Sequence, residues 1–169
     1  MEIVLKQLLE GHNRLAFQEN QESLGIKPED MFLMYPAEID FDILRTGDKY
    51  RFDGKIAAII EPECARCLKL FTYPVNVRVN FILDQSEAVS SDQMDDDDYR
   101  FISKSTLTYD VRSQVREALL VSLPMKLLCS PDCLGLCPQC GINRNTQKCN
   151  CKTENADPRW GKLSELLKG

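Results

Sequence analysis

Alternating apolar and polar positions fill much of the first half of the chain and predict a β-sheet. The alternation is clearest in residues 71–83 and 39–43, where every second side chain is apolar and one face of a strand would be buried. Residues 50–61 follow a turn at 47–48 and end in the unbroken apolar run 57–60, which is typical of a strand covered on both faces. We therefore expect an antiparallel sheet or a small barrel with polar residues facing water.

Weaker signals flank this sheet. Residues 2–9 and 14–19 are separated by the turn-forming trio 11–13, and we expect two further strands there. Residues 84–98 show no apolar periodicity and end in four consecutive aspartates, which indicates an acidic, solvated loop. A cation site or an electrostatic shield over the C-terminal third are the alternatives for this loop. A short strand at 99–102 would return the chain to the sheet.

Two helices are predicted downstream. Apolar residues recur at helical spacing from Asp110, a candidate N-cap, to the helix-breaking Pro124, so we expect one long helix over 110–123. A shorter amphipathic helix should begin after Asp157-Pro158, because a capping residue there precedes a proline at the first helical position.

Composition limits the possible classes of protein. The 169 residues are 43% hydrophobic and 28% charged, which is the balance of a globular protein. No apolar stretch approaches the roughly 18 residues of a membrane span, and no basic leader precedes an apolar run. We therefore expect a cytoplasmic protein without a membrane partner.

Eight cysteines form the strongest chemical signal. Six of them lie between Cys129 and Cys151, and the other two form the pair Cys64-Ala-Arg-Cys67 between two predicted strands. In a reducing compartment such a density favours metal binding over a disulfide framework, which is the alternative. Tetrahedral zinc takes four thiolates in structural sites of this kind.

The spacing divides the cysteines into two sets of four. Cys137-Pro-Gln-Cys140-Gly141 has the form of a metal-binding knuckle, and the pair Cys149 and Cys151 can close the same site. The remaining cysteines would form the other site: Cys64, Cys67, Cys129 and Cys133. We expect two structural Zn²⁺ ions, and a single site with some thiols left free is the alternative.

The predicted fold is thus α+β with two parts. A mainly antiparallel β domain over residues 1–123 would include the acidic loop and the long helix. A module over residues 124–169 would hold most of the cysteines, bind zinc and end in the short helix. The site formed by Cys64, Cys67, Cys129 and Cys133 would fasten the turn between two long strands to the segment that follows the long helix.

The net charge of −5 is unevenly distributed. Residues 84–98 carry seven acidic and no basic residues, whereas residues 99–169 carry eleven Lys and Arg against six Asp and Glu. The excess of five positive charges in this last third would fall to about three if four thiolates there bound one zinc ion. A region of this charge suits contact with phosphates.

Catalytic chemistry has little support. The pair Cys64-Ala-Arg-Cys67 could be a redox site in which Arg66 lowers a thiol pKa, but a strand follows it where a thioredoxin-like site has a helix. The single histidine, His12, lies in a predicted turn. With four protein ligands, zinc would also have no open position for water. We expect neither an enzyme nor a small-molecule substrate.

The cysteine motifs and their order resemble a known family. The motifs are Glu63-Cys64-Ala-Arg66-Cys67-Leu68, Leu123-Pro124-Met-Lys126-Leu-Leu-Cys129, Cys133-Leu-Gly135-Leu136-Cys137-Pro138-Gln-Cys140-Gly141-Ile-Asn143, and Cys149-Asn-Cys151 followed by Asp157-Pro158-Arg159. From about Glu38 to the C-terminus they resemble the YceD family, which is linked to accumulation of large-subunit ribosomal RNA in bacteria and plastids. The resemblance implies a non-enzymatic role in ribosome biogenesis and no catalytic residue.

Three hypotheses for function follow. In the first, a zinc module presents five cations to a ribosomal RNA precursor or to a protein of the large ribosomal subunit: Arg144, Lys148, Lys152, Arg159 and Lys162. In the second, the module and the last helix form an adaptor that docks a ribosomal protein or a nuclease. In the third, the protein is a thiol oxidoreductase or a zinc store.

Overall fold

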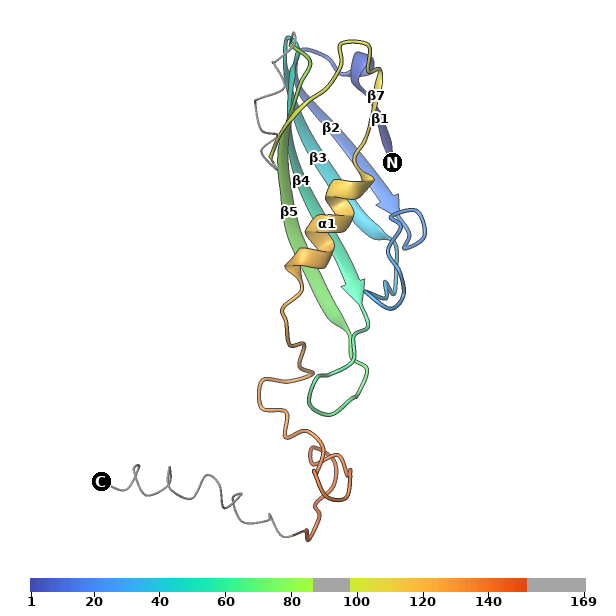
Figure 1. The fold of residues 1–169 in the computed structure, drawn as a ribbon, viewed down its shortest axis with the longest axis vertical. Helices are drawn as coiled ribbons and strands as arrows, with labels where there is room; N and C mark the ends of the chain where they lie inside the picture. Colours follow the sequence, from blue (N-terminus) through green and yellow to red (C-terminus); the bar gives the residue numbers. More distant parts are fainter. Residues whose placement is uncertain (87–97, 152–169) are drawn as a thin grey trace, which may run out of the picture.

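A five-stranded sheet forms the body of the protein. The computed structural model describes residues 1–86 and 98–151, and the sheet has the strand order β2-β3-β4-β5-β6 (Figure 1). Its strands are β2 (Gly11–Glu19), β3 (Ala37–Thr46), β4 (Lys49–Ile60), β5 (Tyr73–Asp84) and β6 (Tyr99–Phe101). The remaining elements are β1 (Glu2–Val4), the short 3-10 helix η1 (Leu5–Gln7), β7 (Thr108–Asp110) and the helix α1 (Arg112–Ser122), which lies across one face of the sheet.

The prediction of a mainly β, α+β fold is confirmed, with three differences. The sheet is open among the described strands, with β2 and β6 at its edges, and does not close into the small barrel that we considered. The β5–β6 pair is parallel, whereas the other neighbours are antiparallel. The helix has 11 residues, an average length, and is therefore not the long helix that was predicted. Within the described residues, no helix has the length and apolar character needed to span a membrane.

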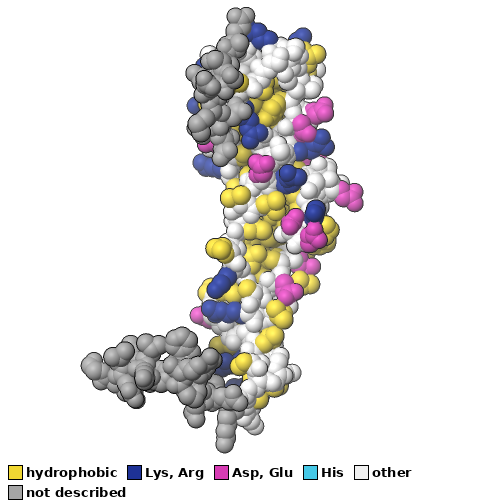
Figure 2. Space-filling view, in the orientation of Figure 1, with side chains coloured by type: hydrophobic (Ala, Val, Ile, Leu, Met, Phe, Trp, Pro, Cys, Tyr) yellow, Lys and Arg dark blue, Asp and Glu magenta, His cyan; other side chains and the backbone are white. Residues whose placement is uncertain are grey.

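One face of the sheet carries the core. Phe41, Phe52 and Phe81 come from three neighbouring strands and meet there, with ring centroids 4.5 Å apart for Phe52 and Phe81 and 5.9 Å apart for Phe41 and Phe52. Val115 and Leu119 of α1 are fully buried against this face. In Figure 2, hydrophobic side chains run along the middle of the face that bears the helix.

The strand β4 is buried on one face only, contrary to the prediction from the run 57–60. Burial alternates strictly along β4, so that Ala58 and Ile60 are buried while Ala57 and Ile59 are exposed, Ile59 to 38%. The reason is the position of α1, which covers one side of the sheet only. Within the described residues no second layer covers the apolar run, and its alternate side chains, Ala57 and Ile59, are exposed.

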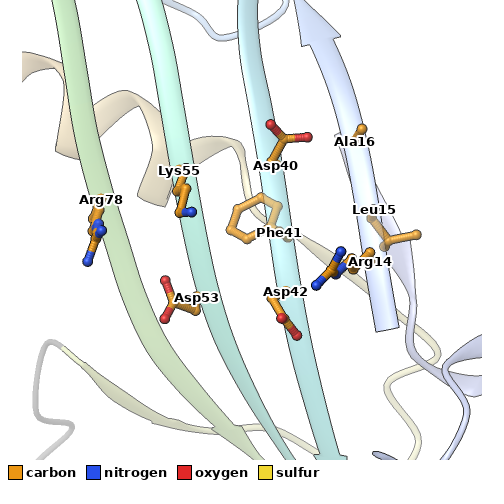
Figure 3. Close-up of a pocket in the computed structure, with 9 residues that line it drawn as sticks. All are labelled: Arg14, Leu15, Ala16, Asp40, Phe41, Asp42, Asp53, Lys55 and Arg78. Carbon is orange, nitrogen blue, oxygen red and sulfur yellow. The ribbon is translucent and has the colours of Figure 1, made fainter. Parts of the chain in front are cut away.

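The opposite face of the sheet is polar. It is hollowed over the middle of four strands into a cavity of about 590 Å³, whose lining residues are shown in Figure 3. The side chain of Lys55 lies there between those of Asp40 and Arg78, its partners in register on β3 and β5. Acidic and basic groups alternate across this surface, so it offers no field of a single sign.

The N-terminal segments differ from the prediction. Only the first three residues of 2–9 form a strand, β1, and this strand pairs with β7 instead of β2. The trio 11–13 belongs to β2 because Gly11 pairs in register with Arg45, and so it is not a turn. His12 is accordingly an exposed strand residue, and its Nδ1 lies 2.9 Å from a carboxylate oxygen of Asp42.

The predicted end of the helix is confirmed, whereas its predicted cap is shifted. Val111 occupies the N-cap position, and Asp110, one residue earlier, accepts a hydrogen bond of 3.1 Å from the Arg112 backbone N–H. The Arg112 guanidinium lowers the pKa of Asp110 to about 2. The helix ends before Leu123, next to Pro124. Most of the acidic loop (87–97) and the helix predicted after residue 157 lie outside the described residues.

A tight approach at Gly54 gives the first testable prediction. Gly54 of β4 stands in register with Phe41 and Val79, and a Cβ at this position would lie 2.5 Å from Phe41 Cε1 and 2.7 Å from Val79 Cγ1. Because the core would have to shift, Gly54→Ala should lower the free energy of unfolding by about 1–3 kcal/mol in urea denaturation. Ala57, an exposed residue of the same strand, provides the control: Ala57→Val should change the free energy of unfolding by less than about 0.5 kcal/mol. Equal effects of the two substitutions would contradict the packing described.

Candidate metal centre

The connection between β4 and β5 forms a tip at one end of the sheet, and the chain returns to this tip after α1 (Figure 1). The tip carries Cys64 and Cys67, as the sequence predicted. The backbone N–H of Ala65 donates a hydrogen bond of 2.9 Å to the carbonyl of Leu127, in the segment that follows the helix. Two parts of the chain more than sixty residues apart are thereby held side by side.

The first cysteine tetrad lies at this meeting point and consists of Cys64, Cys67, Cys129 and Cys133. Its four sulfur atoms lie within 4.8 Å of one another, and the distances are 3.8 Å between Cys64 and Cys133 and 3.6 Å between Cys67 and Cys129. A tetrahedron with Zn–S bonds of about 2.3 Å has sulfur atoms about 3.8 Å apart. Cys64 is fully buried, and Cys67 and Cys133 are nearly so. This tetrad has the donor set and the size of a closed structural metal site.

The second cysteine tetrad follows directly in the chain and consists of Cys137, Cys140, Cys149 and Cys151. Its sulfur atoms also lie within 4.8 Å of one another, but Cys140 and Cys151 are exposed. The structure thus brings the eight cysteines together in the same two sets that their spacing predicted. Each set could hold a metal ion.

Both tetrads are built on the same local turn. The N–H of Leu68 bonds to the carbonyl of Cys64 at 2.9 Å, and the N–H of Gly141 bonds to the carbonyl of Cys137 at 2.9 Å. Leu68 and Gly141 occupy the same place after the second cysteine, with positive φ angles of 58° and 72°. Glycine adopts this conformation without strain, whereas leucine does so at a cost of about 1–2 kcal/mol. The sequence motif indicated the glycine but gave no signal for the leucine.

Backbone amides favour thiolates at both tetrads. The N–H of Cys129 lowers the pKa of Cys64 to about 6, and the N–H of Cys140 lowers the pKa of Cys137 to about 6. Loss of solvation raises the pKa of Cys129 to about 12, and the neighbouring Cys140 thiol raises that of Cys151 to about 12. Each tetrad thus combines a thiol that ionises readily with a thiol that resists ionisation, through lost solvation at Cys129 and through a neighbouring thiol at Cys151. A divalent cation removes this resistance, because it neutralises the thiolates that it binds.

The two tetrads are joined by the short segment 133–136. The guanidinium of Arg66 donates a hydrogen bond of 2.9 Å to the carbonyl of Cys133, and the carbonyl of Arg66 accepts one of 3.1 Å from the N–H of Leu136. Gly135 lies so close to Arg66 that a Cβ would stand 2.9 Å from its carbonyl oxygen. Arg66, which the sequence suggested as a modulator of a redox thiol, therefore connects the tip to the second tetrad.

Two of the five predicted contact cations lie at the second tetrad. Arg144 and Lys148 are exposed and line a cavity of about 760 Å³ together with Cys137, Cys149 and Cys151. The other three, Lys152, Arg159 and Lys162, lie outside the described residues. We call these two exposed cations, Arg144 and Lys148, the basic rim of the second tetrad.

The family model described as "Large ribosomal RNA subunit accumulation protein YceD" matches residues 52–167. The chain belongs to the YceD family. The match includes both tetrads, most of β4, and the whole of β5 and β6, whereas β2 and β3 lie before it. The family is named for RNA accumulation and not for a catalytic activity.

Relatives of this YceD-family chain occur in bacteria and plants. An uncharacterized protein of Mycobacterium tuberculosis H37Rv, Rv2926c, is 29% identical over 130 residues, which make up 77% of this chain and 61% of that protein. The large ribosomal RNA subunit accumulation protein YCED homolog 1, chloroplastic, of Arabidopsis thaliana is 26% identical over 155 residues, covering 78% of this chain and 48% of that protein. The uncharacterized protein YlbN of Bacillus subtilis is 29% identical over 120 residues, covering 69% of this chain and 66% of that protein.

The chain spans about half to two thirds of the length of the curated relatives it matches. No solved structure matches it.

The junction between the tetrads gives a prediction with a matched control. Gly135 and Gly141 both have positive φ, but a Cβ on Gly141 would meet nothing within 4 Å. Gly141→Ala should therefore cost only backbone strain, about 1–2 kcal/mol, whereas Gly135→Ala should cost a further 1–3 kcal/mol or so because it pushes Arg66 away. Hydrogen exchange at Ala65 and Leu136 should increase for Gly135→Ala and not for Gly141→Ala. The same exchange in both variants would show that segment 133–136 does not pack on the tip.

Proposed function

We propose that this protein supports the accumulation of large-subunit ribosomal RNA as a non-enzymatic ribosome biogenesis factor whose C-terminal module is held in shape by two structural zinc ions. The observation that carries the proposal is the first tetrad, in which two cysteines of the sheet tip meet two cysteines from beyond the helix. Membership of the YceD family supplies the link to ribosomal RNA. The site of action would be the cytoplasm, although the Arabidopsis relative is named as chloroplastic.

Zinc is the metal that fits the donor set best. Four thiolates at tetrahedral spacing suit a soft or borderline ion, and zinc in such sites has no redox role and no open coordination position. The apparent binding free energy of one such site is roughly 10–16 kcal/mol in zinc-finger peptides. A redox function has less support, because each cysteine of the pair Cys64 and Cys67 lies beside a cysteine from a distant segment.

The division of the chain into a β domain (1–123) and a zinc module (124–169) is part of this proposal. Residues 64–67 belong to the first part but would share a metal with the second. The module would then be fixed to the end of the sheet, about which it could not rotate freely. Its basic rim would keep a set orientation relative to the sheet.

The RNA partner would be contacted through the basic rim of the second tetrad. Arg144 and Lys148 are exposed, flank the same cavity and lie on the loop that the tetrad closes. Lysine and arginine that neutralise phosphates release counterions, so binding should weaken as salt rises. The proposed partner is a ribosomal RNA precursor, and Lys152, Arg159 and Lys162 are proposed as further contacts to it.

Charge reversal tests this surface. Arg144→Glu with Lys148→Glu should weaken binding to a large-subunit ribosomal RNA transcript and lower the slope of log K against log salt by about 2, because two phosphate contacts are lost. Lys55→Glu with Arg78→Glu makes the same change in net charge on the polar face of the sheet and is the matched control (Figure 3). Binding can be measured by fluorescence anisotropy between 50 and about 200 mM salt. Equal losses for both pairs would exclude the basic rim as the contact.

An adaptor that binds a ribosomal protein or nuclease is the second candidate, and Leu68 favours it. Its side chain is 58% exposed although its backbone has the strained positive φ that Gly141 adopts in the second knuckle. Leu70 and Leu134 are also exposed, at 55% and 58%. An exposed leucine in a strained conformation does not stabilise the isolated protein, so a protein partner that covers it is a specific explanation.

Replacement of Leu68 separates the two candidates. Leu68→Gly should raise the free energy of unfolding of the isolated protein by about 1 kcal/mol, because the positive φ no longer costs strain. If the adaptor hypothesis holds, the same variant should restore less large-subunit ribosomal RNA than the unchanged protein does in a strain that lacks the gene. Full restoration by the more stable variant would argue against a partner at the tip.

A further inference from the structure

The two tetrads differ in exposure, and a hydrogen bond links the loop of the second tetrad to a cysteine of the first. Three cysteines of the first tetrad are buried, whereas Cys140 and Cys151 of the second are exposed. Between Cys140 and Cys149 runs a loop whose two ends meet at the second tetrad. Its backbone is also bonded to segment 135–137, at 2.9 Å from the Arg144 N–H to the Gly135 carbonyl and at 2.8 Å from the Cys137 N–H to the Ile142 carbonyl. From this loop Asn145 reaches the first tetrad, where its Nδ2 donates a hydrogen bond of 3.3 Å to the Sγ of Cys133.

The orientation of the Asn145 side chain is fixed on both sides. Its Oδ1 accepts a hydrogen bond of 2.8 Å from the backbone N–H of Leu134, the residue after Cys133. Its Nδ2 also lies 2.8 Å from Oδ1 of Asn143, which in turn accepts the N–H of Asn145 at 3.0 Å. The amide therefore presents its donor to the sulfur and its acceptor to the backbone beside the sulfur. It acts as an outer-shell partner of a cysteine that belongs to the other metal site.

We propose that Asn145 couples the two metal sites, so that metal in the second tetrad strengthens metal binding in the first. This inference rests on the proposed function, because it requires both tetrads to bind metal. A metal bound at the second tetrad fixes both ends of the loop 140–149 and so holds Asn145 against Cys133. The hydrogen bond then withdraws negative charge from a thiolate in a site where four thiolates repel one another.

Linkage makes the coupling reciprocal. If metal in the second tetrad raises the affinity of the first by some factor, metal in the first must raise the affinity of the second by the same factor. The exposed second site would exchange its metal more readily, and its occupancy would thereby set how firmly the buried first site holds the module to the sheet. Asn145 is thus a positioning residue that acts through Cys133.

The experiment is a double-mutant cycle on metal affinity. It compares the unchanged protein, Asn145→Ala, Cys140→Ser with Cys151→Ser, and the combination of all three substitutions. Each protein is loaded with zinc and titrated with a chelator, and the occupancy of the first site is read as protection of Cys64 and Cys67 from alkylation by mass spectrometry. Loss of an outer-shell partner costs metal affinity by about 10- to 100-fold in comparable sites.

We expect Asn145→Ala to weaken the first site by about 10- to 100-fold when the second site is intact. When Cys140 and Cys151 are already replaced, the same substitution should have a smaller effect, because the ends of the loop are no longer held by a metal and Asn145 is held less firmly against Cys133. Asn145→Asp should weaken the first site at least as much: it keeps the acceptor for the Leu134 N–H and places a carboxylate beside the thiolates. Gln147→Ala, an exposed position of the same loop, should change nothing.

Two outcomes would overturn the coupling. If Asn145→Ala lowers the metal affinity of the first site equally with and without Cys140 and Cys151, Asn145 supports the first site only and does not couple the two. If no Asn145 variant changes that affinity, Asn145 has no part in metal binding. Failure of the unchanged protein to protect any cysteine would overturn the metal sites themselves, and with them the proposed function.

With Co²⁺ in the first site, the sulfur-to-metal absorption band should move to lower energy in Asn145→Ala, because the hydrogen bond no longer stabilises the sulfur electrons. An unchanged band would likewise contradict the contact.

Discussion

The architecture depends on one constraint: four thiols from two distant segments must share a small volume. The apolar surroundings of the first tetrad are limited to a few partly buried side chains, among them Phe71, Leu128 and Leu136. Such a cluster is far smaller than the sheet core under α1 and offers little stabilisation by burial. A cation bound by the four sulfurs can supply what this cluster lacks, because metal binding to such a site contributes directly to folding. In our proposal the C-terminal module is therefore secured at the tip of the sheet.

We thus propose that the molecule combines two kinds of stabilisation, side-chain packing and metal binding. The sheet and α1 are held by side-chain packing, including the contact of Phe52 with Phe81 and the close approach at Gly54. Beyond the tip, hydrogen bonds from Arg66 and Asn145 to Cys133 link the two tetrads. In our proposal the packed part is a rigid base, and the metal-dependent part carries the basic rim that meets a ribosomal target.

The sequence predicts much of this arrangement because its periodicities and spacings are local. The strands that carry Phe41 and Phe81 follow from the alternation of apolar and polar residues. The second tetrad follows from the knuckle motif, and the first tetrad consists of the four cysteines that this motif leaves over. The pairing of β1 with β7 and the parallel β5–β6 pair could not be predicted, because they depend on contacts between segments that local patterns do not describe. For the same reason the roles of Leu68 and Asn145 could not be foreseen: one is a strained backbone angle, and the other is a contact between two sites.

The most direct test of the account is amide hydrogen exchange on the untagged protein before and after chelation, with zinc counted in the same samples. We predict two zinc ions per chain at the start. After their removal, exchange should rise sharply at residues 64–67 and 127–149, because the tip and the module lose their link, while the protected amides of β3 and β4 should hardly change. A protein that contains no metal as purified and yet shows slow exchange at both tetrads would contradict the account.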